Sequence, residues 1–479
     1  TGGTAATDDV VLTNGTAATS VTMTSVGAIT ANANNLAAAA SITATAAEDS
    51  AITSDGVSNQ VVNLNADSSG ITNTPEITYT LAASTIETLN LGGVTAIEVS
   101  IDQADISTET VTSTNTAGSA LLFSSADNNA DTTAVAAGID MRLGADMNGQ
   151  TFTVDNDNKF VLLDSVAQTA TPTFDHTTEA TTTTTNSLTV ATYNDDAATG
   201  DETASIAGLA FTDINNLTIA MGGTGTDKVG IDSSADITGA DLVTVTVTGE
   251  GAFDLNGNTI TGNATSTTSN VTLDATGVSG IVTMALDGTA NGVESIQTGS
   301  GADAITIGAA AASGNAQSVT TNGGNDTLNI GAAVNFTFDG GPGVDTVSFA
   351  AGSDMSTKSM TLTSVEQIQL VGGGATQTIN ASFISGKSFI LKDDATTSNL
   401  TINMDQAVVD VSSLGLDSSI VDGTDAITID ASGLGLVTTI TGSGTSDTIT
   451  GSAAADDITG GGGIDTITAG TGNDTISGG

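Results

Sequence analysis

Apolar and polar residues alternate along much of the chain, which is the pattern of β-strands that bury one face. The segments LVTVTV (242–247), VTLDAT (271–276) and DAITID (425–430) show this alternation clearly. Val, Ile and Thr favour extended backbone, and the chain has only three prolines to interrupt strands. No stretch shows a convincing apolar stripe at helical spacing. The pattern therefore predicts an all-β protein.

The clearest repeat lies in residues 442–479. An aspartate recurs there every nine residues, and an isoleucine follows each aspartate by two positions. The glycine-rich part of each unit is suited to a tight turn, because glycine accepts left-handed backbone conformations at no steric cost. The remaining x-Ile-x forms a short strand whose isoleucine points inward. Two units then complete one coil, so residues eighteen apart stack on one side of the coil.

This stacking brings carboxylates close together, with Asp447 over Asp465 and Asp456 over Asp474. Two carboxylates about 4 Å apart repel by roughly 4 kcal/mol at an effective dielectric constant of about 20. A hard cation between them removes this cost. Calcium takes about six to eight oxygen ligands, and turn carbonyls can supply those that the aspartates do not. All four aspartates are therefore predicted calcium ligands.

Related turns recur upstream at irregular intervals, which indicates about one coil per step with loop insertions. Segments 222–230 and 340–348 match the full unit, and four others match it in part. Their aspartates are further predicted calcium ligands: Asp227 and Asp345 in the full matches, and Asp303, Asp326, Asp425 and Asp8 in the partial ones.

The chain is strongly acidic, with 54 acidic and six basic residues and a formal net charge of −48 at pH 7. A nucleic-acid partner held through its phosphates needs clustered Lys and Arg. An anionic lipid surface needs a basic patch. We therefore expect neither partner, and no direct membrane insertion, since no apolar run reaches the length of a membrane span. Neutralisation by divalent cations fits this composition better.

Composition and segment boundaries predict three regions. Residues 1–176 form a Thr/Ala-rich β region, either solenoid or sandwich, that ends before the Thr-rich run 177–187. Residues 188–420 form an irregular β-solenoid with scattered calcium turns, and residues 421–479 form a regular β-roll array. With 3% aromatic residues and no Trp or Cys, we expect thin coils burying Val, Ile and Leu rather than a bulky aromatic core. The first residue is Thr and no signal peptide is apparent, so we interpret the chain as a piece of a longer one.

The nine-residue unit is similar to the RTX β-roll repeat G-G-x-G-x-D-x-U-x, where U is a large aliphatic residue. Strands of the form U-E-x-U-x precede Gly-rich turns at 85–91, 292–298 and 364–370; we interpret their glutamates as stacked at coil corners rather than as ligands. With its Thr/Ala/Gly/Asp-rich, cysteine-free composition, the chain resembles lattice regions of alphaproteobacterial S-layer proteins, most densely over 210–479.

That resemblance implies a right-handed parallel β-solenoid, which loop insertions could bend into several segments. It also implies type I secretion to the cell surface, calcium-ordered folding and self-assembly into a two-dimensional lattice. Anchoring to a cell-surface polysaccharide or lipopolysaccharide would use a region not in this chain.

Other functions stay open. An RTX adhesin or another type I-secreted β-solenoid would use the same coils, and polysaccharide lyases and hydrolases can use paired carboxylates. The only histidine, His176, is interpreted as a solvated loop residue, and the lack of cysteine leaves little material for nucleophilic catalysis. We therefore predict no catalytic residues and a structural, non-enzymatic protein.

Overall fold

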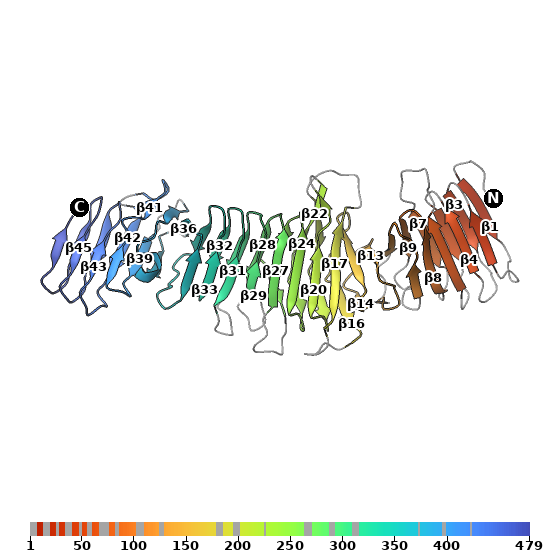
Figure 1. The fold of residues 1–479 in the computed structure, drawn as a ribbon, viewed down its shortest axis with the longest axis horizontal. Coiled ribbons are helices and arrows are strands. Elements are labelled where there is room, and N and C mark those ends of the chain that lie inside the picture. Colours follow the sequence, from red (N-terminus) through yellow and green to blue (C-terminus); the bar gives the residue numbers. More distant parts are fainter. Residues whose placement is uncertain are drawn as a thin grey trace. The chain divides into compact units, whose positions relative to one another are not determined.

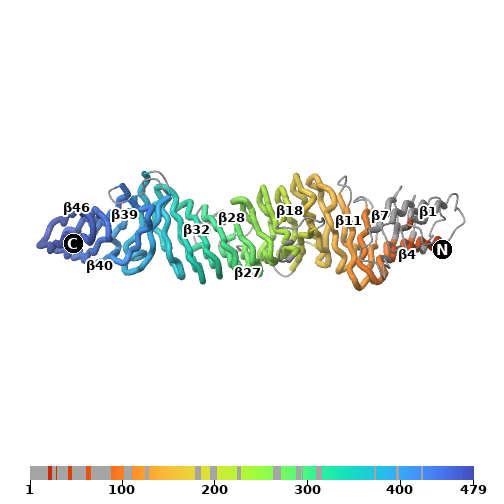
Figure 2. The backbone as a smooth tube through the Cα atoms, turned by 90° about the horizontal axis from the view of Figure 1, so that it is seen from above, coloured from red at the N-terminus to blue at the C-terminus, as the bar shows by residue number. Residues whose placement is uncertain are grey.

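The computed structural model describes the chain apart from these residues: 1–6, 13–19, 25–27, 34–40, 47–49, 55–59, 67–75, 82–85, 102–109, 124–128, 179–184, 195–201, 225–226, 263–270, 287–292, 309–315, 372–373, 395–398 and 422–423. The chain divides into two compact units, Thr1–Asn263 and Ala264–Gly479. In each unit, strands of successive coils stack side by side, as the ribbon in Figure 1 and the tube in Figure 2 show.

The first unit contains four sets of hydrogen-bonded strands. The longest set runs in the order β1 (Thr7–Leu12), β3 (Ala28–Ala33), β5 (Ser50–Ser54), β7 (Glu76–Leu81), β9 (Ile97–Ile101), β11 (Ser119–Phe123), β13 (Ile139–Leu143), β15 (Lys159–Leu163), β17 (Ser187–Tyr193), β20 (Asn216–Ala220) and β24 (Thr244–Gly249). The second is β2 (Ser20–Thr24), β4 (Ser41–Ala46), β6 (Gln60–Ala66), β8 (Ile86–Gly93) and β10 (Thr110–Ser113). The third is β12 (Ala130–Asp131), β14 (Thr151–Val154), β16 (Thr173–His176), β19 (Leu209–Thr212), β23 (Ile237–Gly239) and β26 (Ile260–Thr261). The fourth is β18 (Glu202–Ile206), β22 (Asp227–Ser233) and β25 (Phe253–Asp254), with β21 (Gly223–Thr224) beside β22.

The second unit is built in the same way. One set is β27 (Val271–Val278), β29 (Val293–Gln297), β31 (Gln317–Thr320), β33 (Phe336–Asp339) and β35 (Met360–Thr363). Another is β28 (Val282–Leu286), β30 (Ala304–Ile307), β32 (Thr327–Ile330), β34 (Thr346–Phe349), β36 (Gln367–Leu370), β38 (Ile390–Asp393) and β41 (Gly415–Leu416). The C-terminal sets are β37 (Thr376–Asn380), β39 (Asn399–Asn403), β42 (Ala426–Asp430), β44 (Asp447–Thr450) and β46 (Thr466–Thr468), and β40 (Val408–Asp410), β43 (Thr439–Thr441), β45 (Asp457–Thr459) and β47 (Thr475–Ser477). A single helical turn, α2 (Ala381–Ile384), lies among the described residues.

The all-β structure predicted from the alternating pattern and the parallel β-solenoid predicted from the repeats and the resemblance are confirmed. Strands of neighbouring coils pair in parallel and mostly in register, as where Thr448 lies beside Thr466. The described antiparallel pair is β21 with β22. Strand β42 shows why the alternation fits this fold, because Ile427 and Ile429 are buried while the residues between them are only half-buried. Each coil thus buries a few aliphatic side chains and relies on the coils above and below it.

The expectation of a core without bulky aromatic residues is wrong for the first unit. Phe152, Phe174 and Phe211 occupy the same register on β14, β16 and β19 and stack in one column, with ring centroids 5.6 Å and 5.5 Å apart. Phe123 and Phe160 pack against Phe152 at 5.9 Å and 4.9 Å. A composition average hid this column because the phenylalanines are concentrated in a few coils. Each such pair contributes about 0.5–1.5 kcal/mol beyond its buried area.

The Thr-rich run 177–187 lies between strands of one continuous stack. Strand β15 pairs with β17 and strand β16 pairs with β19, so neighbouring coils bridge the run on both sheets. Of the two arrangements considered for residues 1–176, the structure has the solenoid.

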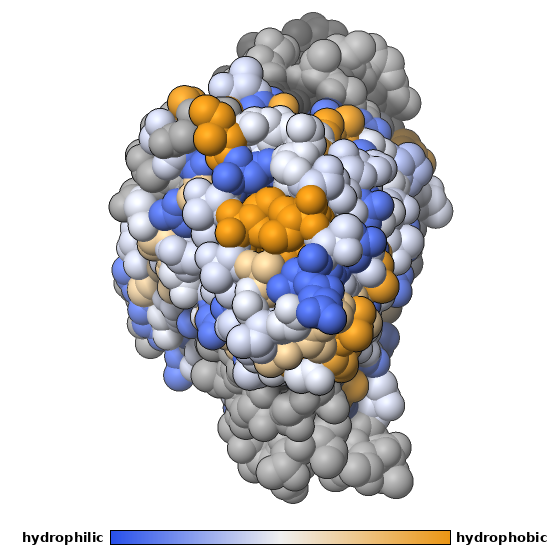
Figure 3. Space-filling model, turned by 90° about the vertical axis from the view of Figure 1, so that its left-hand side faces the viewer, coloured by the Kyte–Doolittle hydropathy of each residue, from blue (hydrophilic) through white to orange (hydrophobic). Residues whose placement is uncertain are grey.

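The C-terminal coils show what the stacking does for the inward isoleucines. Ile449 and Ile458 are fully buried, whereas Ile476 in β47 is 53% exposed because its coil has a neighbour on one side only. Ile464, in the turn before β46, is 86% exposed. Figure 3 looks onto this side of the molecule, where apolar side chains stand among hydrophilic ones.

Candidate metal centres

The C-terminal nine-residue repeats close one coil for every two units, as predicted. Strand β44 pairs with β46, and β45 pairs with β47. The backbone N–H of Asp447 donates to Oδ1 of Asp465 over 3.0 Å, and that of Asp456 donates to Oδ1 of Asp474 over 3.0 Å. The predicted stacking of aspartates eighteen residues apart is thereby confirmed. These N–H donors also offset part of the repulsion that the sequence argument assigned to a cation alone.

The first two aspartates of the array have both carboxylate oxygens hydrogen-bonded. Asp447 accepts the N–H of Ser443 on Oδ2 over 2.7 Å and the Ser443 hydroxyl on Oδ1 over 3.0 Å. Asp456 accepts the N–H and hydroxyl of Ser452 over 2.7 Å and 2.9 Å, and the N–H of Thr438 over 2.8 Å. Burial raises the pKa of Asp456, but these hydrogen bonds outweigh it and the net pKa is lowered.

Asp465 differs from them in one oxygen. Its Oδ2 is buried and has no hydrogen-bond partner among the described residues. Gly461 occupies the position that Ser443 holds one coil earlier, so no hydroxyl reaches this carboxylate. The same oxygen faces Gly460, where an added Cβ would clash with it and would lie 2.6 Å from the carbonyl oxygen of Gly478. A carboxylate oxygen and a carbonyl oxygen thus both pack closely against Gly460, as they also do against Gly442 beside Asp447 and Gly451 beside Asp456, so the feature that sets Asp465 apart is its unpaired Oδ2.

A second set of stacked acids lies upstream, and we call it the internal acid ladder: Asp303, Asp326, Asp345 and Glu366. The N–H of Asp303 donates to Asp326 Oδ1 over 2.7 Å, and that of Asp326 donates to Asp345 Oδ1 over 2.8 Å. The N–H of Asp345 donates to Glu366 Oε2 over 2.9 Å. The prediction that Glu366 is a stacked corner residue is confirmed; the side chains of Glu87 and Glu294 lie outside the described residues.

Two rungs of this ladder carry an unpaired oxygen. Oδ2 of Asp326 and Oδ2 of Asp345 are buried without a partner among the described residues, whereas Asp303 Oδ2 accepts the Thr298 hydroxyl. Burial raises the pKa of Asp326 to about 7, against the hydrogen bond from Asp303 N–H, and the Asp303 and Asp345 charges raise it further. Burial also raises the pKa of Asp345, and Glu366 adds to that shift.

Asp345 repeats the geometry of Asp465. An added Cβ on Gly340 would lie 2.5 Å from Asp345 Oδ2 and 2.5 Å from the carbonyl oxygen of Ser364. Both aspartates follow a Gly-Gly pair, in GGPGVD (340–345) and GGGGID (460–465). Before Asp447 and Asp303 a Ser or Thr replaces one of these glycines, and its hydroxyl donates to the carboxylate. Thr321 holds the corresponding position before Asp326, but its hydroxyl donates to the Gly340 carbonyl over 3.1 Å.

The other predicted ligands are not part of these stacks. Asp425 is 9% exposed and accepts the N–H of Val421 within its own turn over 2.6 Å. Asp227 begins β22 and pairs with Thr224 in the antiparallel β21–β22 hairpin, and Asp8 lies in β1. The side chains of Asp227 and Asp8 lie outside the described residues, so their metal roles stay predictions.

His176 is not a solvated loop residue, and that interpretation was wrong. It ends β16 and is 6% exposed, with its Nδ1 accepting the N–H of Thr178 over 3.0 Å. The sequence FDHTTEA looked polar, but alternation along β16 turns Phe174 and His176 inward together. The inward-facing position of His176 on β16 explains why its side chain is buried.

The donor set of the unpaired oxygens suits a hard cation. In the part of the chain that the structure describes, no three or more Asp, Glu, His or Cys side chains are grouped so that they could hold one metal ion together. Asp465 and Asp345 instead each offer one carboxylate oxygen near one backbone carbonyl, and calcium accepts such oxygen ligands whereas softer metals do not favour them. Among the described residues no helix is long and apolar enough to cross a membrane.

Comparison with known families also indicates calcium-binding repeats at the C-terminal end of the sequence. Residues 433–467 and 459–479 match the model of the RTX calcium-binding nonapeptide repeat, which holds four copies of the unit. The array is similar to RTX repeats. We call residues 433–479 the RTX array, and the protein is a parallel β-solenoid that carries it. No curated protein and no solved structure matches the chain.

Sequence reasoning found the stacked aspartates and missed what surrounds them. It did not anticipate the backbone N–H bonds between rungs, because these depend on coil-to-coil register. It also did not anticipate that Ser443 and Ser452, four positions before Asp447 and Asp456, donate their hydroxyls to these carboxylates, whereas glycine stands at that position before Asp465 and Asp345. That signal is visible in the sequence once the hydrogen bonds are known.

Proposed function

We propose that the protein is a calcium-dependent, self-assembling structural subunit of a cell-surface S-layer, exported by type I secretion. The observation that carries the calcium part is the unpaired, buried Oδ2 of Asp465 facing the Gly478 carbonyl inside the RTX array. Extracellular fluid is rich in calcium, so folding would be completed after export. The protein would act through its shape and contacts and not as an enzyme.

Asp465 would hold calcium in the array, with Asp345 and Asp326 as the corresponding ligands in the internal acid ladder. When bound, calcium supplies the positive charge that these buried carboxylates lack. Gly460 and Gly340 let the carboxylate oxygen and one carbonyl oxygen of the next coil, from Gly478 and Ser364 respectively, come close together, so both oxygens would be available to the same cation. A site assembled from two coils is absent in the unfolded chain, so metal binding stabilises the stack.

Charge supports the assembly part of the proposal. At −48, copies of the chain repel one another strongly at low ionic strength. Contacts between copies would therefore need divalent cations at the interface. Calcium would then act inside the coils and between molecules, and a lattice would form only where calcium is plentiful. Partner contacts would be made with other copies, and with a surface polysaccharide or lipopolysaccharide through another region.

Electron microscopy of the purified chain tests this directly. We expect ordered two-dimensional sheets in millimolar calcium and none after chelation, with magnesium a poor substitute because it demands smaller octahedral sites. The double variant Asp465→Asn, Asp345→Asn should assemble poorly in calcium, whereas Asp157→Asn, at an exposed acid in the turn between β14 and β15, should behave as wild type.

Two other outcomes would replace the proposal. Monodisperse rods with and without calcium would point to an adhesin stalk, which needs coils but no lattice. Release of reducing or unsaturated sugars from an acidic polysaccharide would point to a hydrolase or lyase.

A further inference from the structure

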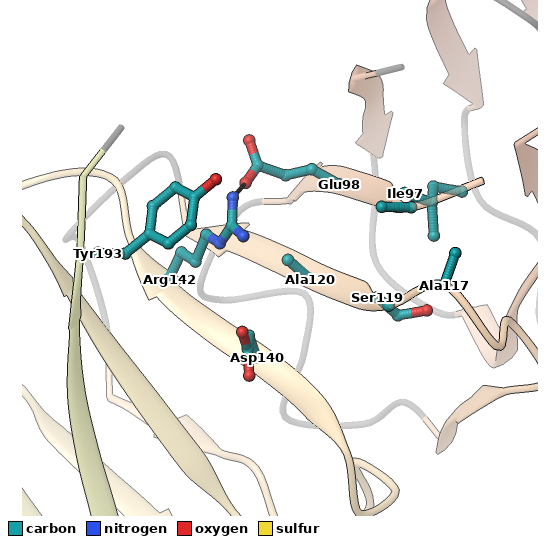
Figure 4. Close-up of a pocket in the computed structure, with 10 residues that line it drawn as sticks. Ile97, Glu98, Ala117, Ser119, Ala120, Asp140, Arg142 and Tyr193 are labelled. Atoms are coloured by element: carbon teal, nitrogen blue, oxygen red, sulfur yellow. Dashed lines mark hydrogen bonds and ion pairs between the residues drawn. The ribbon is translucent and has the colours of Figure 1, made fainter. Parts of the chain in front are cut away.

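A hollow in the first unit concentrates residue types that are rare in this chain. Its volume is about 410 Å³, and it lies over the outer face of β9, β11 and β13, with Tyr193 at the end of β17 as one wall (Figure 4). Ala120 stands in register between Glu98 on one side and Asp140 on the other. Because the Ala120 side chain is short, it leaves space between the side chains of Glu98 and Asp140.

The charges around the hollow are paired. The guanidinium of Arg142 donates to Glu98 Oε2 and lies 4.0 Å from the centroid of the Tyr193 ring. Lys159 Nζ contacts Asp140 Oδ1 at 2.7 Å. The chain has six basic residues and two tyrosines among its 479 residues. Two of these basic residues, Arg142 and Lys159, and one of the tyrosines, Tyr193, lie at or beside the hollow. The charges within these two ion pairs cancel, in a chain whose net charge is −48.

The two ion pairs limit the kind of ligand that the hollow can bind. Glu98 and Asp140 would repel an anion such as phosphate or a uronate. Their ion pairs with Arg142 and Lys159 in turn leave a metal cation little unbalanced negative charge to bind. Among the described residues the guanidinium bonds to Glu98 alone, so several of its N–H groups remain to donate. Tyr193 is 41% exposed, so its aromatic ring adds an apolar surface to the hollow.

Interleaved donors and acceptors beside an exposed aromatic ring fit a neutral polyhydroxylated ring. A sugar hydroxyl can donate to a carboxylate and accept from a guanidinium at once, and the C–H face of a pyranose packs against an aromatic side chain. The volume falls in the usual range for small-ligand pockets. We propose that this hollow binds a neutral sugar residue of a polysaccharide. Both acids are held in ion pairs, so the site binds the sugar and does not cleave it.

The rarity of aromatic residues makes the site directly observable. The chain has no Trp, and its tyrosines are Tyr79 and Tyr193, so in the Tyr79→Phe variant all tyrosine fluorescence comes from the hollow. We would titrate this full-length variant with maltohexaose, cellohexaose and N-acetylchitohexaose, and with hexagalacturonate as the acidic comparison. We expect a saturable change with at least one neutral probe and none with hexagalacturonate. No saturable change with any of the three neutral probes overturns the proposal.

Variants then assign the binding to this hollow by calorimetry with the probe that binds. Tyr193→Ala and Arg142→Lys should each weaken it at least about tenfold, whereas Tyr193→Phe, which keeps the ring, should stay within about threefold. Equal binding by wild type and Tyr193→Ala would also overturn the proposal. Asp465→Ala should bind the sugar like wild type, because the hollow contains no residue of the RTX array. Loss of assembly and loss of sugar binding are therefore separate results.

Discussion

The RTX array and the internal acid ladder use one hydrogen-bond scheme at different sequence spacings. In the array, each linked pair of acids is eighteen residues apart. In the ladder, the corresponding steps are 23, 19 and 21 residues. In both, the N–H of one acid donates to the carboxylate of the acid one coil later. Sequence regularity is therefore not required for the stack, because a loop can absorb extra residues while the strands stay in register.

The aspartates with an unpaired oxygen differ in burial between the two regions, although Asp447 and Asp456 of the array are as buried as the ladder acids. Asp326 and Asp345 are fully buried, whereas Asp465 is partly exposed. Loss of water destabilises the charged form of a fully buried, unpaired carboxylate more than that of a half-exposed one. The ladder should therefore depend more strongly on whatever neutralises it than the array does. The following experiments are designed to test that difference.

The largest effect is expected from Asp345→Ala in the ladder. The change removes the acceptor of the buried Asp326 N–H, and an unpaired buried donor costs about 1–3 kcal/mol. It also removes a calcium carboxylate, so the loss should be larger in calcium than in chelator. Urea denaturation in both conditions measures it.

The isosteric variant Asp345→Asn sharpens the same test, since its amide oxygen can still accept the Asp326 N–H. We expect this variant to be more stable than wild type in chelator, because a buried charge is gone, and less stable in calcium. A variant that is less stable than wild type in both conditions would contradict a calcium role for Asp345.

The next effect compares aspartates within the RTX array. In calcium, Asp465→Ala should destabilise the array more than Asp447→Ala, because Asp465 Oδ2 is unpaired and Asp447 is served by Ser443. In chelator the two variants should be similar, each leaving a backbone N–H without its acceptor. Amide hydrogen exchange over residues 433–479 resolves this local difference, with the Phe152 column as an internal standard. Equal exchange of both variants in calcium would refute the assignment.

How far the sequence predicted these sites can be judged from particular residues. Period-two alternation and nine-residue spacing were enough for the parallel solenoid and for Asp447 over Asp465. The Phe152 column was missed because composition is an average over coils. The burial of His176 was missed because a polar segment hides which face of β16 turns inward. The ion pair of Arg142 with Glu98 links strands of different coils, so it depends on register that a single sequence does not display.

A pH effect of intermediate size should come from Asp326. Its pKa is raised from 3.8 to about 7 by burial, so the folded state holds a proton that the unfolded state has released. Without calcium, stability should therefore be greatest in acid and should fall as pH rises through about 7. The unfolding midpoint in urea between about pH 5 and about pH 8 measures this, and Asp326→Asn should flatten the profile. A wild-type profile that rises over this range would be inconsistent with a neutral Asp326.

The smallest effect, and the most specific one, is expected from Ser443→Gly. Without calcium it should destabilise the array by about 1 kcal/mol, because the Ser443 hydroxyl no longer donates to Asp447. It also converts this turn to the Gly-Gly form that precedes Asp465 and Asp345, whose Oδ2 atoms are unpaired. The backbone N–H of residue 443 still donates to Asp447 Oδ2, so the substitution removes the hydroxyl bonds alone. We expect the loss of these bonds to let the variant bind one calcium ion more than wild type, as counted by native mass spectrometry.

The matched control for this gain is Ser446→Gly, the same substitution three residues later. The Ser446 hydroxyl accepts the N–H of Ile464 over 2.8 Å, so its loss should weaken the turn without freeing a carboxylate. If Ser443→Gly and Ser446→Gly both leave the calcium count unchanged, hydroxyl pairing does not decide which aspartates bind. If only Ser443→Gly raises it, the residue four positions before each aspartate sets which turns of the solenoid are calcium sites.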